Sequence, residues 1–238
     1  MISFRKIVNK ILYPHTYSSD AYISFLRKNG VRIGNGTWFV KPKSTCVDVQ
    51  NAIFIEIGDN VCITDGVTIL AHDWSYSVIA RKYNDAPGKQ CVTHIGNNVF
   101  IGTHSIILMG SYVGNNVIIG AGSVVTGKLD DDSVYAGNPA KKICTIEEYY
   151  CKLKNTFEKS AYCYFKRHLD VNNKIPNMEN VGLYASLFVD KNDENMKKYF
   201  SSSAIPFAIK NMPKKYNNVD EFMKEMEKNG LNGKRNNT

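Results

Sequence analysis

The sequence lacks the marks of several common protein classes. None of its six cysteines forms a Cys-x-x-Cys pair, so the spacing typical of zinc sites is missing and we expect no bound metal. No apolar run is long enough to span a bilayer. Arg5, Lys6 and Lys10 interrupt the first apolar residues and no small-residue cleavage site follows, so we find no secretory signal and expect a reducing, cytoplasmic location.

The charge balance is moderately basic. The 238 residues include 30 Lys and Arg against 22 Asp and Glu, a formal net charge of +8. Such an excess suits an anionic ligand such as coenzyme A, an acidic polysaccharide or an anionic membrane surface. Nucleic acid is not favoured as a partner, because no binding motif accompanies the charge. The composition is that of a globular protein, and the length allows one domain of ordinary size with an appendage.

What the sequence does contain is a six-residue repeat between residues 95 and 142. A branched aliphatic residue stands at every sixth position: Ile95, Ile101, Ile107, Val113, Ile119 and Val125. This period fits neither an α-helix nor a short alternating strand. It is the repeat of a parallel β-helix, in which each hexapeptide forms a short strand and a corner, and three complete a triangular coil. Gly-Asn-Asn follows Ile95 and Val113, and suits a corner because Gly and Asn tolerate positive φ.

Changes in pattern divide the chain. Residues 1–30 predict N-terminal helices, residues 31–143 an all-β core formed by the β-helix, and residues 144–238 a C-terminal helical appendage. Capping motifs at residues 145–148 and 218–221 mark two helix starts in the appendage. For the N-terminal helices we favour covering the open end of the β-helix over anchoring to a membrane surface, because their hydrophobic stripe is short.

A long insertion interrupts the β-helix. The tags Ile57-Gly-Asp-Asn and Ile95-Gly-Asn-Asn lie further apart than one coil of three hexapeptides requires. The excess of about 20 residues predicts a loop at about residues 71–93, and loops of this length in compact folds are usually functional.

The segment that closes the repeat is specific to one family. Residues 120–143 read GAGSVVTGKLDDDSVYAGNPAKKI. With the repeat, they resemble the end signature of hexapeptide-repeat acyltransferases, whose fold is a left-handed parallel β-helix. The hand is implied by the resemblance, since the usual crossover preference is right-handed. His72-Asp-Trp-Ser, the Gly-Asn-Pro-Ala-Lys motif before CTIEEYY, and a helical tail look most like bacterial O-acetyltransferases that act on capsular or cell-surface polysaccharide.

The resemblance implies that His72 is the catalytic base, because the family's histidine stands at the root of this loop. Acyl transfer to a hydroxyl needs such a base, and imidazole suits the task near neutral pH. Taken alone, a loop histidine is more often structural. His104 is the alternative base, and Asp73 or a backbone carbonyl would orient the imidazole. A Cys91 nucleophile paired with His94 is the covalent alternative, whereas the family transfers the acyl group directly.

The resemblance also implies the binding positions for acetyl-CoA as cosubstrate. In similar enzymes the pantetheine arm runs along the coils between two subunits, so we expect a homotrimer. The matching positions are Thr103, Ala121, Thr126, Lys128 and Lys141. Two positions depart from the pattern. Phe100 stands where relatives often have Trp, and Gly127 stands where they often have Lys, which leaves Lys128 one position later.

The acceptor is expected to be a saccharide. Trp74 and Tyr76 in the loop can stack on a sugar face, or else pack the loop onto a neighbouring surface. The sequence thus predicts an acetyl-CoA-dependent O-acetyltransferase. Its alternatives are an N-acetyltransferase for an amino sugar or xenobiotic on the same scaffold, and a non-catalytic β-helix.

Overall fold

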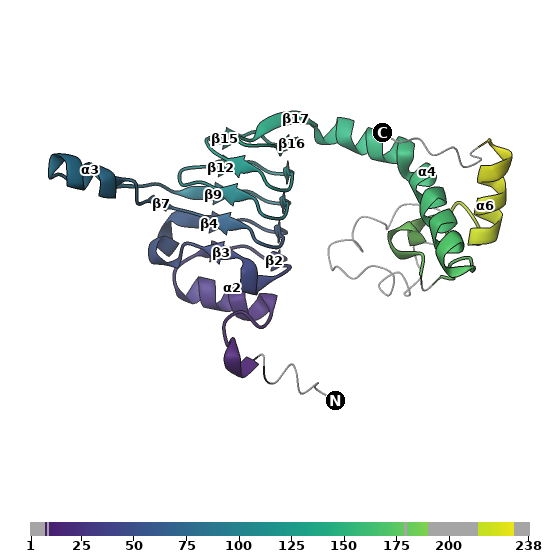
Figure 1. Ribbon diagram of the computed structural model, residues 1–238, viewed down its shortest axis with the longest axis horizontal. Helices are drawn as coiled ribbons and strands as arrows, with labels where there is room; N and C mark the ends of the chain where they lie inside the picture. Colours follow the sequence, from purple (N-terminus) through teal and green to yellow (C-terminus); the bar gives the residue numbers. More distant parts are fainter. Residues whose placement is uncertain (1–7, 9, 179, 190–213, 231–238) are drawn as a thin grey trace. The chain divides into compact units, whose positions relative to one another are not determined.

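The computed structural model describes residue 8 and residues 10–178, 180–189 and 214–230 (Figure 1). The chain divides into two compact units, Met1–Tyr149 and Tyr150–Thr238. The first contains the hexapeptide repeats and the second is helical. Part of the expected first helix and part of the appendage lie outside the described residues.

The first unit is a parallel β-helix with three sheets. Sheet A contains β1 (Arg32–Ile33), β4 (Ile55–Ile57), β9 (Thr93–Ile95), β12 (Tyr112–Val113) and β15 (Lys128–Leu129). Sheet B contains β2 (Trp38–Phe39), β5 (Cys62–Ile63), β10 (Phe100–Ile101), β13 (Ile118–Ile119), β16 (Ser133–Ala136) and the antiparallel edge strand β17 (Lys141–Thr145). Sheet C contains β3 (Cys46–Val47), β6 (Thr68–Ile69), β11 (Ile106–Ile107) and β14 (Val124–Val125).

The core of the coil is a stack of aliphatic side chains. All six in-phase aliphatics of the repeat are fully buried, as the period predicts. Ile95 lies in register with Val113, and Ile101 with Ile119. Each inward residue therefore packs on its counterpart in the next coil, and this burial of apolar surface is the main force that holds the coil together.

The corners use the residues that the sequence places there. Asn98 and Asn116 both have φ of 55°, a left-handed conformation that Asn tolerates. The Asn98 amide donates to Asn116 Oδ1, and the Asn116 amide donates to Asp132 Oδ1, each at 2.8 Å. A ladder of side-chain hydrogen bonds thus links successive corners between sheets A and B.

Helix α2 (Ser19–Lys28) covers one end of the coil. The Ser18 hydroxyl accepts from the Ala21 N–H at 3.2 Å and caps the helix. Tyr22, Ile23 and Leu26 are buried in the same core as the first coils. Val8 and residues 10–12 are also helical, and Ile11 and Leu12 are exposed.

Two 3-10 helices lie in the first coils, η1 (Pro42–Ser44) and η2 (Val49–Phe54). Between β6 and β9 the chain leaves the coil as β7 (His72–Asp73), α3 (Tyr76–Tyr83) and β8 (Lys89–Gln90). We call residues 72–92 the arm. Strands β7 and β8 pair antiparallel, and α3 buries none of its residues. Figure 1 shows α3 projecting from the coil at the end of this arm.

The second unit is built on α4 (Ile146–Asn172), η3 (Gly182–Leu187) and α6 (Val219–Lys228). Both capping motifs form. The Glu148 N–H donates to Thr145 Oγ1 at 3.1 Å, and the Glu221 N–H donates to Asn218 Oδ1 at 2.8 Å. Phe165 and Phe222 are fully buried and meet edge to face. Among the described helices, none has both the length and the apolar character needed to cross a membrane.

Candidate active site

His72 stands where the arm leaves the coil. It begins β7 directly after the buried Ala71, close to the end of β6. The paired strand β8 places Gln90 opposite it. The imidazole is mostly shielded, with 19% of the side chain exposed. A rigid coil on one side and a two-stranded ribbon on the other therefore fix its position.

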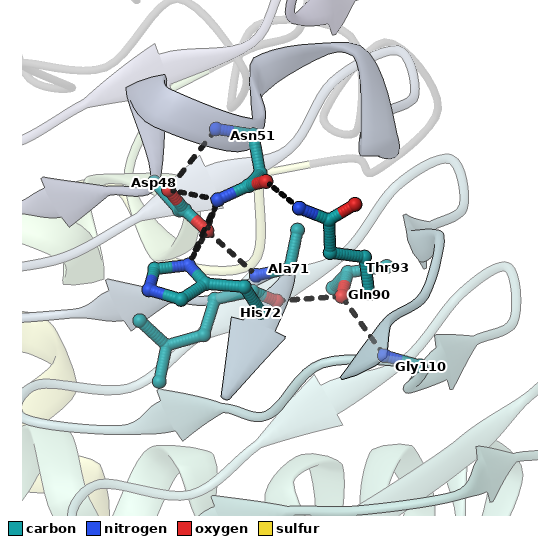
Figure 2. A network of polar contacts seen from close by, with 8 residues as sticks. Asp48, Asn51, Ala71, His72, Gln90, Thr93 and Gly110 are labelled. Atoms are coloured by element: carbon teal, nitrogen blue, oxygen red, sulfur yellow. Dashed lines mark hydrogen bonds and ion pairs between the residues drawn. The ribbon is translucent and has the colours of Figure 1, made fainter. Parts of the chain in front are cut away.

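Asp48 is the partner of His72. It follows β3, which pairs with β6 in sheet C, so it occupies the same corner one coil earlier. Its N–H donates to Ile69 O at 3.0 Å, which locks the two coils together. Asp48 Oδ2 contacts His72 Nδ1 directly, and only 3% of the Asp48 side chain is exposed. Figure 2 shows the carboxylate and the imidazole facing each other across this corner.

The surroundings of Asp48 favour its ionised form. Burial raises the pKa of the carboxyl, but hydrogen bonds from His72, the Ala71 N–H and Asn51 together outweigh burial, so its pKa lies below the usual value. An ionised carboxylate can only accept a hydrogen bond. His72 Nδ1 therefore carries a hydrogen and donates a hydrogen bond to Asp48. In a neutral ring with this tautomer, the other nitrogen, Nε2, carries the lone pair and can accept a proton.

Asn51 and Gln90 complete the polar network around this pair. Asn51 Nδ2 lies 3.2 Å from Asp48 Oδ2 and 3.0 Å from His72 Nδ1. With Nδ1 donating to the carboxylate, the amide donates to Asp48. Gln90 Nε2 donates to Asn51 Oδ1 at 2.8 Å (Figure 2). Asn51 from η2 thus bonds the carboxylate that orients the imidazole, and Gln90 from the arm in turn holds the Asn51 amide.

A cavity of about 470 Å³ opens beside the pair. Its lining residues are Gln50, Asn51, His72, Asp73, Trp74, Tyr76, Gly88, Lys89 and Gln90. They come from η2 and from the arm. One imidazole, one carboxylate, three side-chain amides, a lysine and two aromatic rings therefore line the same cavity.

Trp74 and Tyr76 form an aromatic platform at this cavity. Their rings stack with centroids 5.6 Å apart and planes 25° apart. Trp74 also meets the His72 ring edge to face, with centroids 5.8 Å apart. Trp74 is 60% exposed, so much of its surface is open to a ligand. Such a surface suits the apolar face of a sugar ring.

Asp73 has a different partner from the one that sequence proximity suggests. Its carboxylate accepts from the Ser75 N–H and the Ser75 hydroxyl, both at 2.7 Å. It therefore shapes the turn before α3. Asp73 also lines the cavity, but its carboxylate bonds Ser75 and the His72 ring bonds Asp48.

The other histidines lie outside this network. His94 Nδ1 contacts Glu56 Oε2 at 3.1 Å, and its ring stacks on Tyr112 on the outer face of sheet A. Its described contacts therefore do not include Cys91. His104 is exposed at a corner between sheets B and C, with φ of 57°.

The expected coenzyme positions fall on two corners of the coil. Thr126 directly follows β14, at the corner between sheets C and A where His72 also stands. Thr103 and Ala121 lie at the corner between sheets B and C, stacked by a 2.7 Å bond from the Gly122 N–H to Thr103 O. Sheet C separates them from His72 within one chain.

The two lysines among the expected coenzyme positions lie on different sheets. Lys128 is in β15 of sheet A, with a long 3.8 Å contact to Asp130 and 71% of its side chain exposed. Lys141 is exposed in β17 beside sheet B. Gly127 has φ of 75°, a left-handed conformation that glycine adopts without steric cost. Phe100 is 42% exposed on the outer face of sheet B.

Asp48, Asn51 and Gln90 were not found from the sequence. The pairing of β3 with β6 places residue 48 next to the root of the arm. To predict this contact from the sequence, one would need the strand register of the irregular first coils. Within the described residues, no group of three or more His, Cys, Asp or Glu side chains is gathered as metal ligands.

Fold and site together define a hexapeptide-repeat protein with a carboxylate-bound histidine at the root of an inserted arm. The family model for the bacterial transferase hexapeptide (six repeats) matches residues 93–127. A curated relative, protein CapG of Staphylococcus aureus, is 44% identical over 128 residues, which cover 54% of this chain and 73% of that protein. The chain therefore belongs to the bacterial transferase hexapeptide family, the hexapeptide-repeat acyltransferases.

Two solved acetyltransferase structures are less similar to this chain in sequence than CapG is. A hexapeptide-repeat containing acetyltransferase from Vibrio cholerae is 18% identical with a TM-score of 0.45, covering 60% of this chain and 89% of that one. A maltose O-acetyltransferase from Clostridium difficile is 26% identical with a TM-score of 0.37, covering 53% and 75%. These TM-scores are low, so the family assignment rests on the repeat model and the sequence relative.

Proposed function

We propose that the protein is an acetyl-CoA-dependent O-acetyltransferase that acts on a sugar hydroxyl of a capsular or cell-surface polysaccharide. The observation that carries the proposal is the Asp48–His72 pair at the rim of the arm cavity. A buried carboxylate that accepts from Nδ1 leaves Nε2 as a fixed base, which is what acyl transfer to a hydroxyl requires.

The proposed reaction passes the acetyl group directly from sulfur to oxygen. His72 Nε2 takes the proton of the sugar hydroxyl as the hydroxyl oxygen attacks the thioester carbonyl carbon. The C–S bond then breaks, and the leaving thiolate takes the proton back from the imidazolium. The products are an acetyl ester and the free thiol of coenzyme A. Asp48 supports this cycle by stabilising the imidazolium that forms in the middle.

A complete site on this scheme needs a second copy of the chain. Thr103 and Ala121 are separated from His72 by sheet C, so one chain does not bring the base and these coenzyme positions together. The family resemblance supplies the arrangement, a homotrimer of left-handed coils with the coenzyme held between two subunits. Lys128 and Lys141, both exposed, are the residues proposed to meet coenzyme phosphates.

The saccharide acceptor is supported by the arm. The Trp74–Tyr76 platform provides an exposed ring surface beside the base. The amides of Asn51 and Gln90 and the Lys89 side chain line the same hollow and can bond sugar hydroxyls. The narrower assignment to capsular or cell-surface polysaccharide rests on the motif resemblance.

Two alternative functions would give different reaction products from those of an O-acetyltransferase. An N-acetyltransferase on the same scaffold would use amine acceptors with the same base. A non-catalytic β-helix would consume no thioester. Neither accounts better for the shielded Asp48–His72 pair.

The test is a thiol-release assay of acetyl-CoA with matched oligosaccharide acceptors. We expect thiol release with hydroxyl acceptors, a stable acetyl ester in the product, and loss of both with His72→Ala. An acetamide product from amino sugars alone would replace the proposal with N-acetylation. Absence of thiol release with every acceptor, from protein shown to bind acetyl-CoA, would reject the activity.

A further inference from the structure

One end of the first unit exposes apolar and aromatic side chains beside lysines. We call this surface the N-terminal patch. Its members are Lys10, Ile11, Leu12, Tyr13, Tyr17, Val40, Lys41 and Lys43. Ile11 is 72% exposed, Leu12 63% and Val40 55%. Figure 1 shows the helical turn before α2 lying beyond that helix, at the end of the coil opposite β15.

The N-terminal patch is not needed to close the coil. Helix α2 already covers this end, because Tyr22, Ile23 and Leu26 are buried against the first coils. Ile11 and Leu12 are adjacent in sequence and leave most of their surface in contact with water. Two large aliphatic side chains in this state lack the favourable free energy that burial of their apolar surface would provide. A contiguous exposed group of this kind indicates an interaction surface.

Lysines are held over the tyrosine rings of the patch. Lys43 Nζ lies 3.7 Å from the centroid of the Tyr13 ring, and Lys10 Nζ lies 5.8 Å from that of Tyr17. Both rings are partly exposed, Tyr13 at 46% and Tyr17 at 41%. Lysine and tyrosine side chains of this kind, with apolar bodies and polar tips, are typical of the boundary between a lipid surface and water.

The charge of this region has one dominant sign. No Asp or Glu precedes Asp20 in the sequence, while Arg5, Lys6 and Lys10 do. A hollow of about 430 Å³ lies in the patch, lined by Thr16, Tyr17, Val40, Lys41, Pro42, Lys43, Ser44 and Asp65. Asp65 is the acid at this hollow, and it is engaged by Lys41 at 2.5 Å and by the Ser44 hydroxyl. The patch and its hollow together contain more lysines than acids, and this basic balance complements an anionic surface.

We propose that the N-terminal patch binds the surface of an anionic phospholipid membrane. Ile11 and Leu12 enter the boundary between headgroups and acyl chains, and Tyr13 and Tyr17 lie at headgroup level. Lys10 and Lys43 meet lipid phosphates. A second copy of the chain is a poorer occupant, because two patches of the same sign repel each other. The inference concerns a surface away from the arm cavity and does not depend on the proposed reaction.

The test is co-flotation of the full-length protein with vesicles. With about a third phosphatidylglycerol in phosphatidylcholine we expect binding that weakens as salt is added, and little binding to phosphatidylcholine alone. Lys10→Glu/Lys43→Glu should bind at least about 30-fold more weakly, since each basic residue near the surface contributes about fivefold and the introduced carboxylates add repulsion. Ile11→Ser/Leu12→Ser should bind at least about tenfold more weakly, because both changes remove apolar area that would be buried in the membrane.

Matched controls come from the second unit. Lys154→Glu/Lys159→Glu makes the same charge change, and Lys154 Nζ also lies over a tyrosine ring, that of Tyr150, at 5.6 Å. Leu153→Ser/Leu183→Ser removes two aliphatics that are 50% and 60% exposed. Both controls should keep wild-type vesicle binding. If they lose it as the patch variants do, or if wild-type protein does not float, the proposal fails. A lower sedimentation coefficient for Ile11→Ser/Leu12→Ser without lipid would assign the patch to a second copy instead.

Discussion

Asp48 Oδ2 accepts from His72 Nδ1 across one turn of the coil, although 24 positions separate the two residues in the sequence. The contact joins a corner of the first coil to the root of the arm. Asp48 also accepts from the N–H groups of Ala71 and Asn51, both at 3.2 Å. One buried carboxylate therefore fixes the backbone around the base as well as its ring.

His72→Ala should abolish most of the turnover and little else. Its imidazole lies at the surface end of the network, so the coil should stay folded, and the coenzyme positions Thr103 and Ala121 are at another corner. We expect kcat to fall on the order of 10²–10⁴-fold, the usual contribution of a positioned general base. Acetyl-CoA affinity, measured by calorimetry, should change little. His104→Ala is the control, and a large loss there with near-normal His72→Ala would move the base to the corner between sheets B and C.

Asp48→Asn tests whether the carboxylate fixes the orientation and the tautomer of the imidazole. The amide can donate to Nδ1, which would favour the tautomer with the proton on Nε2 and disable the base. We expect kcat to fall about 10²-fold or more while KM for acetyl-CoA stays near wild type. Asp73→Asn should keep kcat near wild type, because the Asp73 carboxylate bonds Ser75. An equal loss of kcat in both variants would contradict the assignment.

Sequence periodicity predicts the coil but not this pair, and the reason is register. Ile95 and Ile119 are found inward because one short local rule repeats without interruption. Asp48 lies in coils that contain η1 and η2, where extra residues break the six-residue phase. Its relation to His72 then depends on which strands pair, a long-range property. The sequence offered Asp73 or a backbone carbonyl to orient the imidazole, whereas in the structure the Asp73 carboxylate accepts from Ser75.

Tyr22 should make the first unit sensitive to alkali. Burial raises the pKa of its phenol from 10.0 to about 12. Between these values the unfolded phenol ionises while the folded one keeps its proton. The stability that Tyr22 contributes is therefore complete below pH 10 and is lost as pH rises towards about 12. In urea titrations, Tyr22→Phe should lose about 1 kcal/mol at neutral pH with its bond to Thr45 O. The free energy of unfolding of this variant should also fall less steeply with alkaline pH than that of wild type. Tyr17 is exposed, so Tyr17→Phe should match wild type at every pH.

Trp74→Ala should act on the acceptor and leave the coenzyme alone. The ring is 60% exposed and stacks on Tyr76, so its loss removes about half of the platform without opening the core. Stacking of this kind contributes about 0.5–1.5 kcal/mol beyond area, so KM for the saccharide should rise about threefold to tenfold. KM for acetyl-CoA should not change. Tyr83→Ala is the matched control, because Tyr83 is another exposed aromatic residue of the arm and lies in α3. An equal rise in KM for that variant would mean that the whole arm, rather than the platform, determines acceptor binding.

Mixed trimers test whether each site is shared between two copies. His72→Ala removes the base, and Ala121→Glu places a negative charge at the exposed corner proposed for the coenzyme. Each variant alone should be nearly inactive. If a site takes its base from one subunit and its coenzyme corner from the next, random mixing in equal amounts should restore about a quarter of wild-type activity. Mixing either variant with the double variant His72→Ala/Ala121→Glu should restore none. Sedimentation of an active monomer, or no recovery from mixed trimers confirmed by two affinity tags, would place the whole site within one chain.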